Sequence, residues 1–188
     1  MPAIQLPVPK ERNLYLAKQV DQYSMNELSR AILDINNDDE YLVALYKVHG
    51  IDYAPNPINL YIDSYGGYVY QCLGLLAIME KSAAPIHTIV TGCAMSCGFL
   101  ISISGHRRYC YDKSTFLYHQ VSGNASGKTQ DVEEGFFEIK RLQQILERET
   151  INKTKITQKM LADNRAKKID WIFNAKQALK QGIVDEIL

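Results

Sequence analysis

Two periodicities of apolar residues alternate along the chain, and they predict strands and helices in turn. Apolar residues at every second position, or short β-branched and aromatic runs, are typical of β-strands. The predicted strands are "NLYL" (13–16), "PINLYI" (57–62), "IHTIV" (86–90), "RRYCY" (107–111) and "TFLYH" (115–119). Because most of these strands are separated by helical patterns, the sequence predicts an α/β fold with a largely parallel sheet.

The first predicted helix is "SMNELSRAILDI" (24–35). Ser24 and Glu27 have the spacing of a capping box, and Tyr23 is placed to staple onto Leu28. A polar connection that contains prolines is expected to lead from this helix to the next strand.

Two further helices are predicted from apolar faces at helical spacing. The face of the shorter helix, which is expected to end before Pro85, consists of Val69, Cys72, Leu73, Leu76 and Ala77. The longer helix follows the glycine-containing segment "SGNASGKTQ" (122–130). Its face consists of Val132, Phe136, Ile139, Leu142 and Leu146.

Composition narrows the function classes. The 188 residues suffice for one core, so residues 1–188 are expected to form a single domain. Lys plus Arg and Asp plus Glu number 21 each, without a basic stripe, which argues against a nucleic-acid partner. The apolar runs are too short for a membrane span and no signal-peptide pattern is present, so a cytoplasmic protein is expected. Four cysteines without a CxxC pair suggest reduced thiols, and neither a metal nor a cofactor is expected.

The stretch "TGCAMSCG" (91–98) interrupts a β-branched run with small residues and one serine. A strand that feeds a tight turn opening a helix presents a hydroxyl beside free backbone N–H groups. Ser96 is therefore either a helix-capping serine or a nucleophile. The thiols of Cys93 and Cys97 leave open a cysteine nucleophile or a redox switch, although helical spacing favours small packing residues.

A serine nucleophile needs a base to accept its proton. His119 is the best candidate because it ends the predicted strand at 115–119 directly before a glycine-containing loop, at the sheet edge expected for Ser96. The other three histidines lie in polar connections or inside a strand. Asp170 precedes an apolar run that ends at a predicted N-cap, Asn174, and is the candidate to orient the base.

Four segments carry a family resemblance: "INLYIDSYGGYVY", "TGCAMSCGFLISISG", "FLYHQ" and "NAKQALKQGIVDEIL". In this order they resemble the signature segments of the proteolytic subunit of Clp proteases (ClpP), a family of self-compartmentalised serine peptidases. The resemblance runs from about Asn13 to the C-terminus. It implies a ClpP/crotonase-like spiral of ββα units with a projecting handle helix, formed by "SGNASGKTQ" and the helix after it.

The resemblance also implies roles for individual residues. By position, Ser96 corresponds to the family nucleophile, His119 to its general base and Asp170 to the acid that orients the base. Gly67 and Cys97 correspond to the two residues whose backbone N–H groups form the oxyanion hole. Such donors stabilise the charge that develops on the substrate carbonyl oxygen.

A member of this family is expected to be a serine endopeptidase that cleaves unfolded polypeptides inside a homo-oligomer of stacked rings, two heptamers. An AAA+ unfoldase ATPase is an expected partner whose docking stays open. Two alternatives remain: a catalytically silent structural subunit of the same family, and a crotonase-type acyl-CoA enzyme. The intact Ser96, His119 and Asp170 argue against the first, and the lack of an evident basic phosphate site argues against the second.

The sequence departs from the family pattern at several positions. Asp63, Tyr65 and Val121 stand where the family usually has asparagine, proline and proline, and the connection at 41–57 is longer than expected. These departures suggest a divergent member, such as one encoded by a phage or another mobile element.

The N-terminal segment is also shorter than the family pattern. The residues before "NLYL", which include Pro7 and Pro9, are too few for both the pore-lining hairpin and the packing helix of the family. The expected axial pore is therefore open or closed by another segment, such as 41–57.

Overall fold

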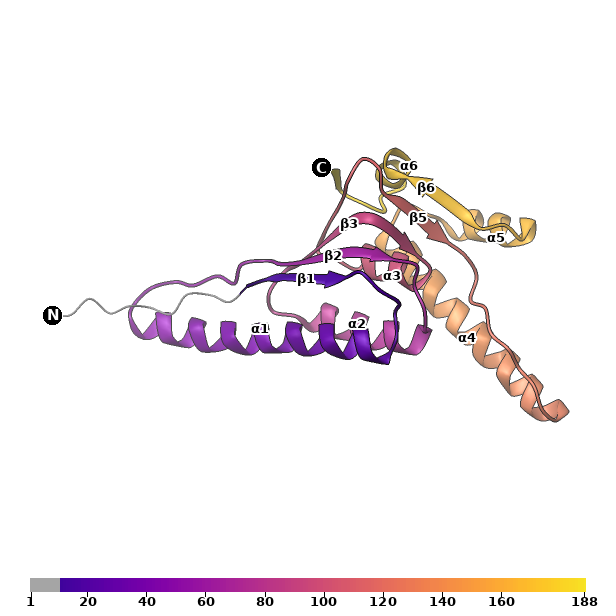
Figure 1. Ribbon diagram of the computed structural model, residues 1–188, viewed down its shortest axis with the longest axis horizontal. Coiled ribbons are helices and arrows are strands. Elements are labelled where there is room, and N and C mark those ends of the chain that lie inside the picture. Colours follow the sequence, from indigo (N-terminus) through magenta and orange to yellow (C-terminus); the bar gives the residue numbers. More distant parts are fainter. Residues whose placement is uncertain (1–10) are drawn as a thin grey trace.

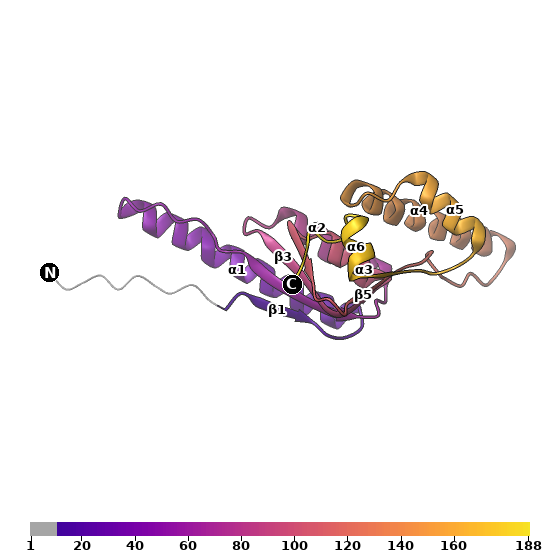
Figure 2. The ribbon, with the colours of Figure 1, turned by 90° about the horizontal axis from the view of Figure 1, so that it is seen from above.

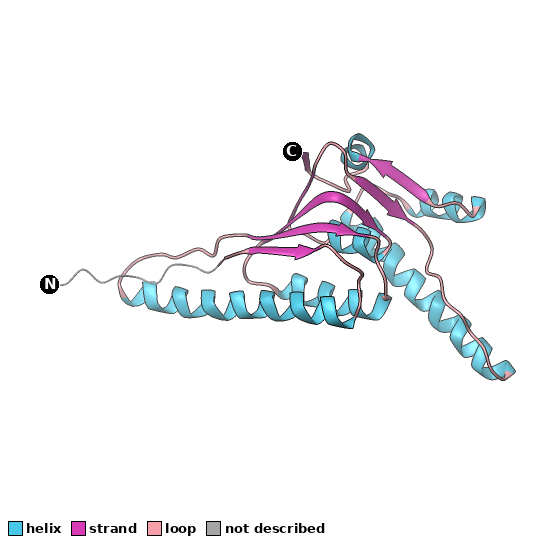
Figure 3. Ribbon diagram, viewed as in Figure 1, coloured by secondary structure: helices cyan, strands magenta, loops and turns pink. Residues whose placement is uncertain are grey.

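The computed structural model describes residues 11–188, so the expectations that concern Pro7 and Pro9 lie outside the described residues. Helices and strands alternate along the chain (Figures 1 and 3). Their order is β1 (Asn13–Leu16), α1 (Gln22–Val48), β2 (Ile58–Ser64), α2 (Val69–Lys81), β3 (Ile86–Met95), α3 (Cys97–Ile103), β4 (Arg107–Cys110), β5 (Thr115–Tyr118), α4 (Thr129–Lys153), α5 (Gln158–Lys167), β6 (Trp171–Asn174), α6 (Ala175–Lys180) and β7 (Glu186–Ile187). The predicted α/β class is confirmed.

The sheet is parallel along the order β1-β2-β3-β4-β7, and it divides at β3. The first part of β3, His87 to Val90, pairs with β4, whereas Cys93 to Met95 pair in parallel with β5. Strand β6 then pairs with β5 in the antiparallel direction. Because β3 and β5 run side by side, the residues that follow both strands lie at the same edge.

Helices α1 and α2 cover one face of β1, β2 and β3 (Figure 1). The alternation predicted for β2 is confirmed, since Ile58, Leu60 and Ile62 are all fully buried. Such burial stabilises the fold by roughly 1.5–3 kcal/mol per aliphatic side chain. The buried apolar residues of the strands and of the helix faces beneath them form one cluster.

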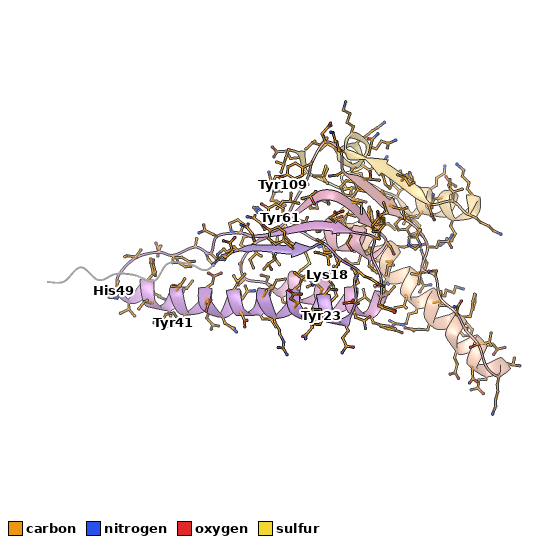
Figure 4. The ribbon with its side chains drawn as sticks, in the orientation of Figure 1. Lys18, Tyr23, Tyr41, His49, Tyr61 and Tyr109 are labelled. Carbon is orange, nitrogen blue, oxygen red and sulfur yellow. The ribbon has the colours of Figure 1, made fainter. Side chains whose placement is uncertain are left out.

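The start of α1 differs from the prediction. The helix begins at Gln22, and its N-cap is Asp21, whose carboxylate accepts the Ser24 N–H at 2.8 Å. Ser24 Oγ in turn accepts the Asp21 N–H at 3.0 Å, so the capping box joins Asp21 and Ser24 and not Ser24 and Glu27. Tyr23 is 75% exposed, and the Lys18 ammonium lies 5.3 Å from the centroid of its ring (Figure 4). The predicted staple is wrong, because Tyr23 lies inside the helix and not before its N-cap.

Helix α1 also continues far beyond the predicted end at residue 35, to Val48. The polar run "NNDDE" hid this continuation, because it interrupts the apolar pattern while Asp39 and Leu42 remain buried on the same face. The carboxylate of Asp39 is bound by the guanidinium of Arg12 and by the hydroxyl of Tyr53. The first half of the predicted connection at 41–57 is therefore helical.

The apolar face of α2 is rotated relative to the prediction. Its most buried side chains are Cys72, Leu75 and Met79, whereas Ala77 is exposed. The helix ends at Lys81, before Pro85, as predicted.

Helix α4 projects away from the sheet, with α5 beside its C-terminal part (Figures 1 and 2). Leu142 and Leu146 are buried against the body of the protein, whereas Phe136 is 60% exposed. The predicted apolar face thus divides into a buried half and a projecting half. No helix within residues 11–188 is long and apolar enough to cross a membrane.

Candidate active site

Ser96 occupies a single-residue turn between β3 and α3. Its φ and ψ angles are 55° and −121°, which is an uncommon backbone conformation for a residue with a side chain. The surrounding backbone holds it there: the Ser96 N–H donates to the carbonyl of Leu117 at 3.0 Å, and the Leu100 N–H donates to the Ser96 carbonyl at 3.3 Å. The turn predicted from residue 92 is thus confined to Ser96, because β3 continues to Met95.

Two glycines bring a second stretch of backbone against this turn. Gly66 has a φ of 94°, and a Cβ atom there would lie 2.6 Å from the Met95 carbonyl oxygen and 2.9 Å from the Cys97 nitrogen. Gly67 has a φ of 153°, and its Cβ would lie 2.1 Å from the Val20 carbonyl oxygen. Only glycine fits either position, because both the conformation and the space exclude a side chain.

The loop that carries these glycines is anchored to the residues after β1. The Val20 N–H donates to the Gly66 carbonyl at 2.8 Å, and the Tyr68 N–H donates to the Val20 carbonyl at 2.8 Å. Ser64 Oγ donates to the carbonyl of Lys18 at 2.6 Å. The backbone beside Ser96 is therefore held by contacts from a distant part of the chain.

A small cavity of about 40 Å³ lies between the Gly66–Gly67 loop, the Ser96 turn and the end of β5. Gly67, Ser96 and His119 all line it, so the structure brings together three of the five predicted site residues. The remaining lining residues are mostly apolar: Val69, Phe99, Leu100, Tyr118, Gln120, Val121, Ser122 and Leu146. A hydroxyl and an imidazole thus share one largely apolar cavity.

Asp170 does not line the cavity. In the antiparallel β5–β6 pair, the last paired residues are Tyr118 and Trp171, and His119 and Asp170 are the next residues beyond this pair on the two segments. Asp170 is exposed, and within residues 11–188 no side-chain hydrogen bond joins His119 to Asp170 or to Ser96. Catalytic hydrogen bonds are often long before substrate binds, so the absence of these bonds does not contradict the roles predicted for His119 and Asp170.

Cys97, the first residue of α3, is only 1% exposed. Its Sγ donates to the carbonyl of Gly67 at 3.3 Å, and the thiol of Cys72 donates to the Cys97 carbonyl at 3.6 Å. The hydrogen bond with Cys97 and burial both raise the pKa of the Cys72 thiol, which keeps it protonated. These buried thiols pack the Gly67 loop against α3, which favours the packing interpretation over a cysteine nucleophile.

Cys93 lies in β3, so it shares no helix with Cys97, contrary to the helical spacing assumed from the sequence. Burial, followed by the neighbouring Asp63 carboxylate, raises the pKa of Cys93 to about 11. Asp63 Oδ1 accepts the Cys93 N–H at 2.9 Å, at a point where the β2–β3 register shifts. Asp63 therefore satisfies a backbone donor beside the site.

Two groups that hold the backbone around Ser96 and His119 were not predicted from the sequence. The carbonyl of Leu117 ties the Ser96 turn to β5, and the amide of Gln143 on α4 binds residues on both sides of His119. Neither group could be recognised in the sequence. Every strand residue has a backbone carbonyl, and a glutamine in an amphipathic helix usually lies on the solvent-exposed face. Within residues 11–188, no group of three His, Cys, Asp or Glu side chains is arranged to hold a metal ion.

Comparison with known proteins identifies the family to which this sequence belongs. The sequence profile of the Clp protease family matches residues 4–188. The chain belongs to the Clp protease family. It is accordingly a peptidase, and its parallel sheet with helices agrees with the fold of this family.

Named relatives within the family agree on the type of subunit. The chain is 29% identical over 182 residues to an ATP-dependent Clp protease proteolytic subunit of Dehalococcoides mccartyi, a match that covers 95% of this chain and 82% of the relative. A proteolytic subunit of Bacteroides fragilis is 29% identical over 181 residues, covering 95% and 79%. A proteolytic subunit 1 of Salinibacter ruber is 34% identical over 141 residues, covering 72% and 58%. These identities fit a divergent member of the Clp protease family.

Proposed function

We propose that this chain is a serine endopeptidase with Ser96 as nucleophile, His119 as general base and Asp170 as the residue that orients the base. The observation that supports this most is the cavity shared by Gly67, Ser96 and His119. The uncommon backbone angles of Ser96 add support, because strained serines at strand-to-helix turns are typical of exposed nucleophiles.

In the proposed reaction, Ser96 Oγ bonds to the substrate carbonyl carbon while its proton passes to the His119 imidazole. The carbonyl electron pair moves to oxygen, and the N–H groups of Gly67 and Cys97 stabilise that charge. Collapse of the intermediate breaks the C–N bond, and the proton on His119 goes to the leaving amine. Water, deprotonated by His119, then adds to the acyl carbon, the C–Oγ bond breaks, and His119 returns the proton to Ser96 Oγ. Loss of one oxyanion donor typically costs about 2.7–4 kcal/mol of transition-state stabilisation.

We further propose that the substrates are unfolded polypeptides and that the chain assembles into stacked rings, two heptamers, that join through α4. The apolar side chains on the projecting half of this helix support an interface there. The named relatives are ATP-dependent subunits, which supports an AAA+ unfoldase as partner. Four free, buried cysteines suit a reducing compartment such as the cytoplasm.

A fluorophosphonate probe tests the nucleophile, because ordinary serines do not react with it. We expect mass spectrometry of the labelled protein to locate the probe on Ser96. Ser96→Ala should abolish labelling and peptide hydrolysis while folding stays intact, since only one hydroxyl is lost. Ser126→Ala, an exposed serine outside the cavity, is the matched control and should label normally.

The same experiment separates the alternatives. A silent structural subunit would fold but leave Ser96 unlabelled, and peptidase activity that persists in Ser96→Ala would end the nucleophile assignment. A crotonase-type enzyme would bind immobilised coenzyme A, which we do not expect of this chain.

A further inference from the structure

The segment that carries His119 is held from outside the sheet by one side chain of α4. Residues 119–128 belong to no helix or strand. Gln143 Oε1 accepts the backbone N–H of Val121 at 2.8 Å, and Gln143 Nε2 donates to the hydroxyl oxygen of Tyr118 at 3.2 Å. Tyr118 and Val121 flank His119, so a single amide group binds the chain on both sides of the imidazole.

The orientation of this amide is determined by a buried carboxylate one helical turn further along α4. Gln143 Nε2 also donates to Glu147 Oε1 at 2.9 Å. If the amide were rotated by half a turn, its oxygen would face the Glu147 carboxylate and its NH₂ group would face the Val121 N–H. Both contacts would be repulsive, so Glu147 selects the orientation that binds Val121.

Glu147 is itself positioned by α5. Its side chain is 8% exposed and pairs with Arg165, whose Nη1 donates to Glu147 Oε1 at 2.5 Å. Gln158 Nε2 donates to the second carboxylate oxygen at 3.3 Å. A buried carboxylate with these partners is held in one geometry, because removing a partner would leave a buried charge uncompensated. Helix α5 ends three residues before Asp170. The hydrogen bonds of Gln143 and Glu147 therefore connect the segment that carries His119 with the helix that precedes Asp170.

The hydroxyl of Tyr118 is suited to this network. Tyr118 is 4% exposed, and its ring packs edge-on against Phe99 with the ring centroids 5.9 Å apart. Burial raises the pKa of Tyr118 to about 12, so the hydroxyl stays neutral at physiological pH and adds no second negative charge beside Glu147. The amide of Gln143 thus lies between one neutral and one negatively charged acceptor, and both of its N–H donors are used.

We propose that Gln143 is a positioning residue for His119, with its amide oriented by the Glu147–Arg165 pair. Gln143 does not line the cavity, so it acts through the backbone of Val121 and the side chain of Tyr118 and not by touching substrate. The proposal rests on the proposed role of His119 as the base for Ser96. It makes the reactivity of Ser96 depend on a helix that contributes no residue to the chemistry.

Gln143→Met tests the proposal, because methionine has a similar length and can form neither hydrogen bond. The rate constant for fluorophosphonate labelling of Ser96 and the kcat for a peptide should fall by about 10²-fold, as expected for a misplaced catalytic group, while KM stays near the wild-type value. Gln144→Met is the matched control, since Gln144 is exposed and its side chain forms no hydrogen bond within residues 11–188. It should label at the wild-type rate.

Hydrogen exchange gives a readout that does not depend on activity. In the wild-type protein, the Val121 amide should exchange at least tenfold more slowly than the exposed amides of residues 124–126, and Gln143→Met should abolish this protection. Wild-type labelling and kcat in folded Gln143→Met would overturn the proposal. Unprotected Val121 in the wild-type protein would overturn it as well, even if Gln143→Met does not fold. Failure of Ser96 to label in the wild-type protein would instead refute the proposed function, while the exchange result would still decide whether Gln143 holds the backbone of Val121.

Discussion

Ser96 and the glycines beside it illustrate how single residues decide the geometry of this site. Gly66 is in close contact with the backbone on both sides of Ser96, and any Cβ at that position would collide with it. The positive φ of Ser96 is maintained because backbone from β5 and from the Gly66–Gly67 loop surrounds it. The conformation of the Ser96 turn is thus a property of backbone contacts, and Ser96 supplies the hydroxyl.

Asp170 gives a prediction at the same scale. Asp170 and His119 are the next residues beyond the last β5–β6 pair, and in the proposed mechanism Asp170 holds the imidazole in the tautomer that accepts the Ser96 proton. Asp170→Asn should therefore lower turnover by orders of magnitude, about 10⁴-fold in the type case of a triad, with little change in thermal stability. Steady-state peptide hydrolysis measures this. Asp163→Asn, another exposed aspartate, serves as control. Near-normal turnover in Asp170→Asn would mean that another group orients His119.

Helix α1 shows at the scale of an element how a helix is extended by contacts far along the chain. Its C-terminal half carries Asp39, which is 1% exposed and lies against Arg12 and Tyr53. The pKa of Arg12 is raised above its usual value, first by the hydrogen bond to Asp39, so the guanidinium stays charged beside that carboxylate. Through Asp39, α1 thus binds Arg12, which precedes β1, and Tyr53, which follows α1.

Removal of the Asp39 carboxylate should therefore destabilise the protein strongly. Asp39→Ala leaves the largely buried Arg12 without its partner, which typically costs about 3–5 kcal/mol. For a chain of this size we expect a fall in the thermal midpoint of roughly 6–20 °C, measured by calorimetry. Glu40→Ala, at the adjacent exposed position, should change stability by no more than about 0.5 kcal/mol. Equal midpoints for the two variants would show that the buried pair contributes nothing.

At the scale of the whole molecule, α4 is both a packing helix and a projection. Its C-terminal half buries Leu142 and Leu146, while its N-terminal half leaves Val132, Phe136 and Phe137 at 39%, 60% and 64% exposure. Apolar side chains gathered on a projecting helix indicate an interface with another chain. Closed ring symmetry would allow every copy to bury this surface in the same way.

The assembly prediction uses the residues that are exposed in the single chain. Val132→Glu/Phe136→Glu should divide the proposed double ring into single rings or smaller species, because two charges would be buried at the proposed α4 interface. Sedimentation velocity measures the change. Gln130→Glu/Gln144→Glu adds the same charges at exposed polar positions of the same helix and should leave the particle whole. If the double glutamate variant at the apolar positions sediments like the wild type, α4 is not the ring interface.

The sequence by itself predicted the strands β1 to β5 and several helix signals, because these depend on residues close together in the chain, but it did not predict β6 and β7. The predicted strand at 13–16 has the observed bounds, and the alternation of Ile58, Leu60 and Ile62 reports a buried face directly. Asn174 was predicted as an N-cap, and its side chain accepts the Gln177 N–H at 2.9 Å. The sequence also singled out Gly67, Ser96 and His119, which the structure brings to one cavity, although their roles remain predictions.

Only the tertiary structure decided the length of α1, the backbone angles of Ser96, the division of α4 into buried and projecting halves, and the contacts of Gln143. Three of these depend on groups far apart in sequence: Arg12 binds Asp39, the Ser96 N–H binds the Leu117 carbonyl, and the Val121 N–H binds Gln143. Periodicity records which face of an element is apolar, but it carries no information about which distant group will satisfy a buried carboxylate, amide or N–H. Such groups must be paired once they are buried, and only the folded chain determines the partner.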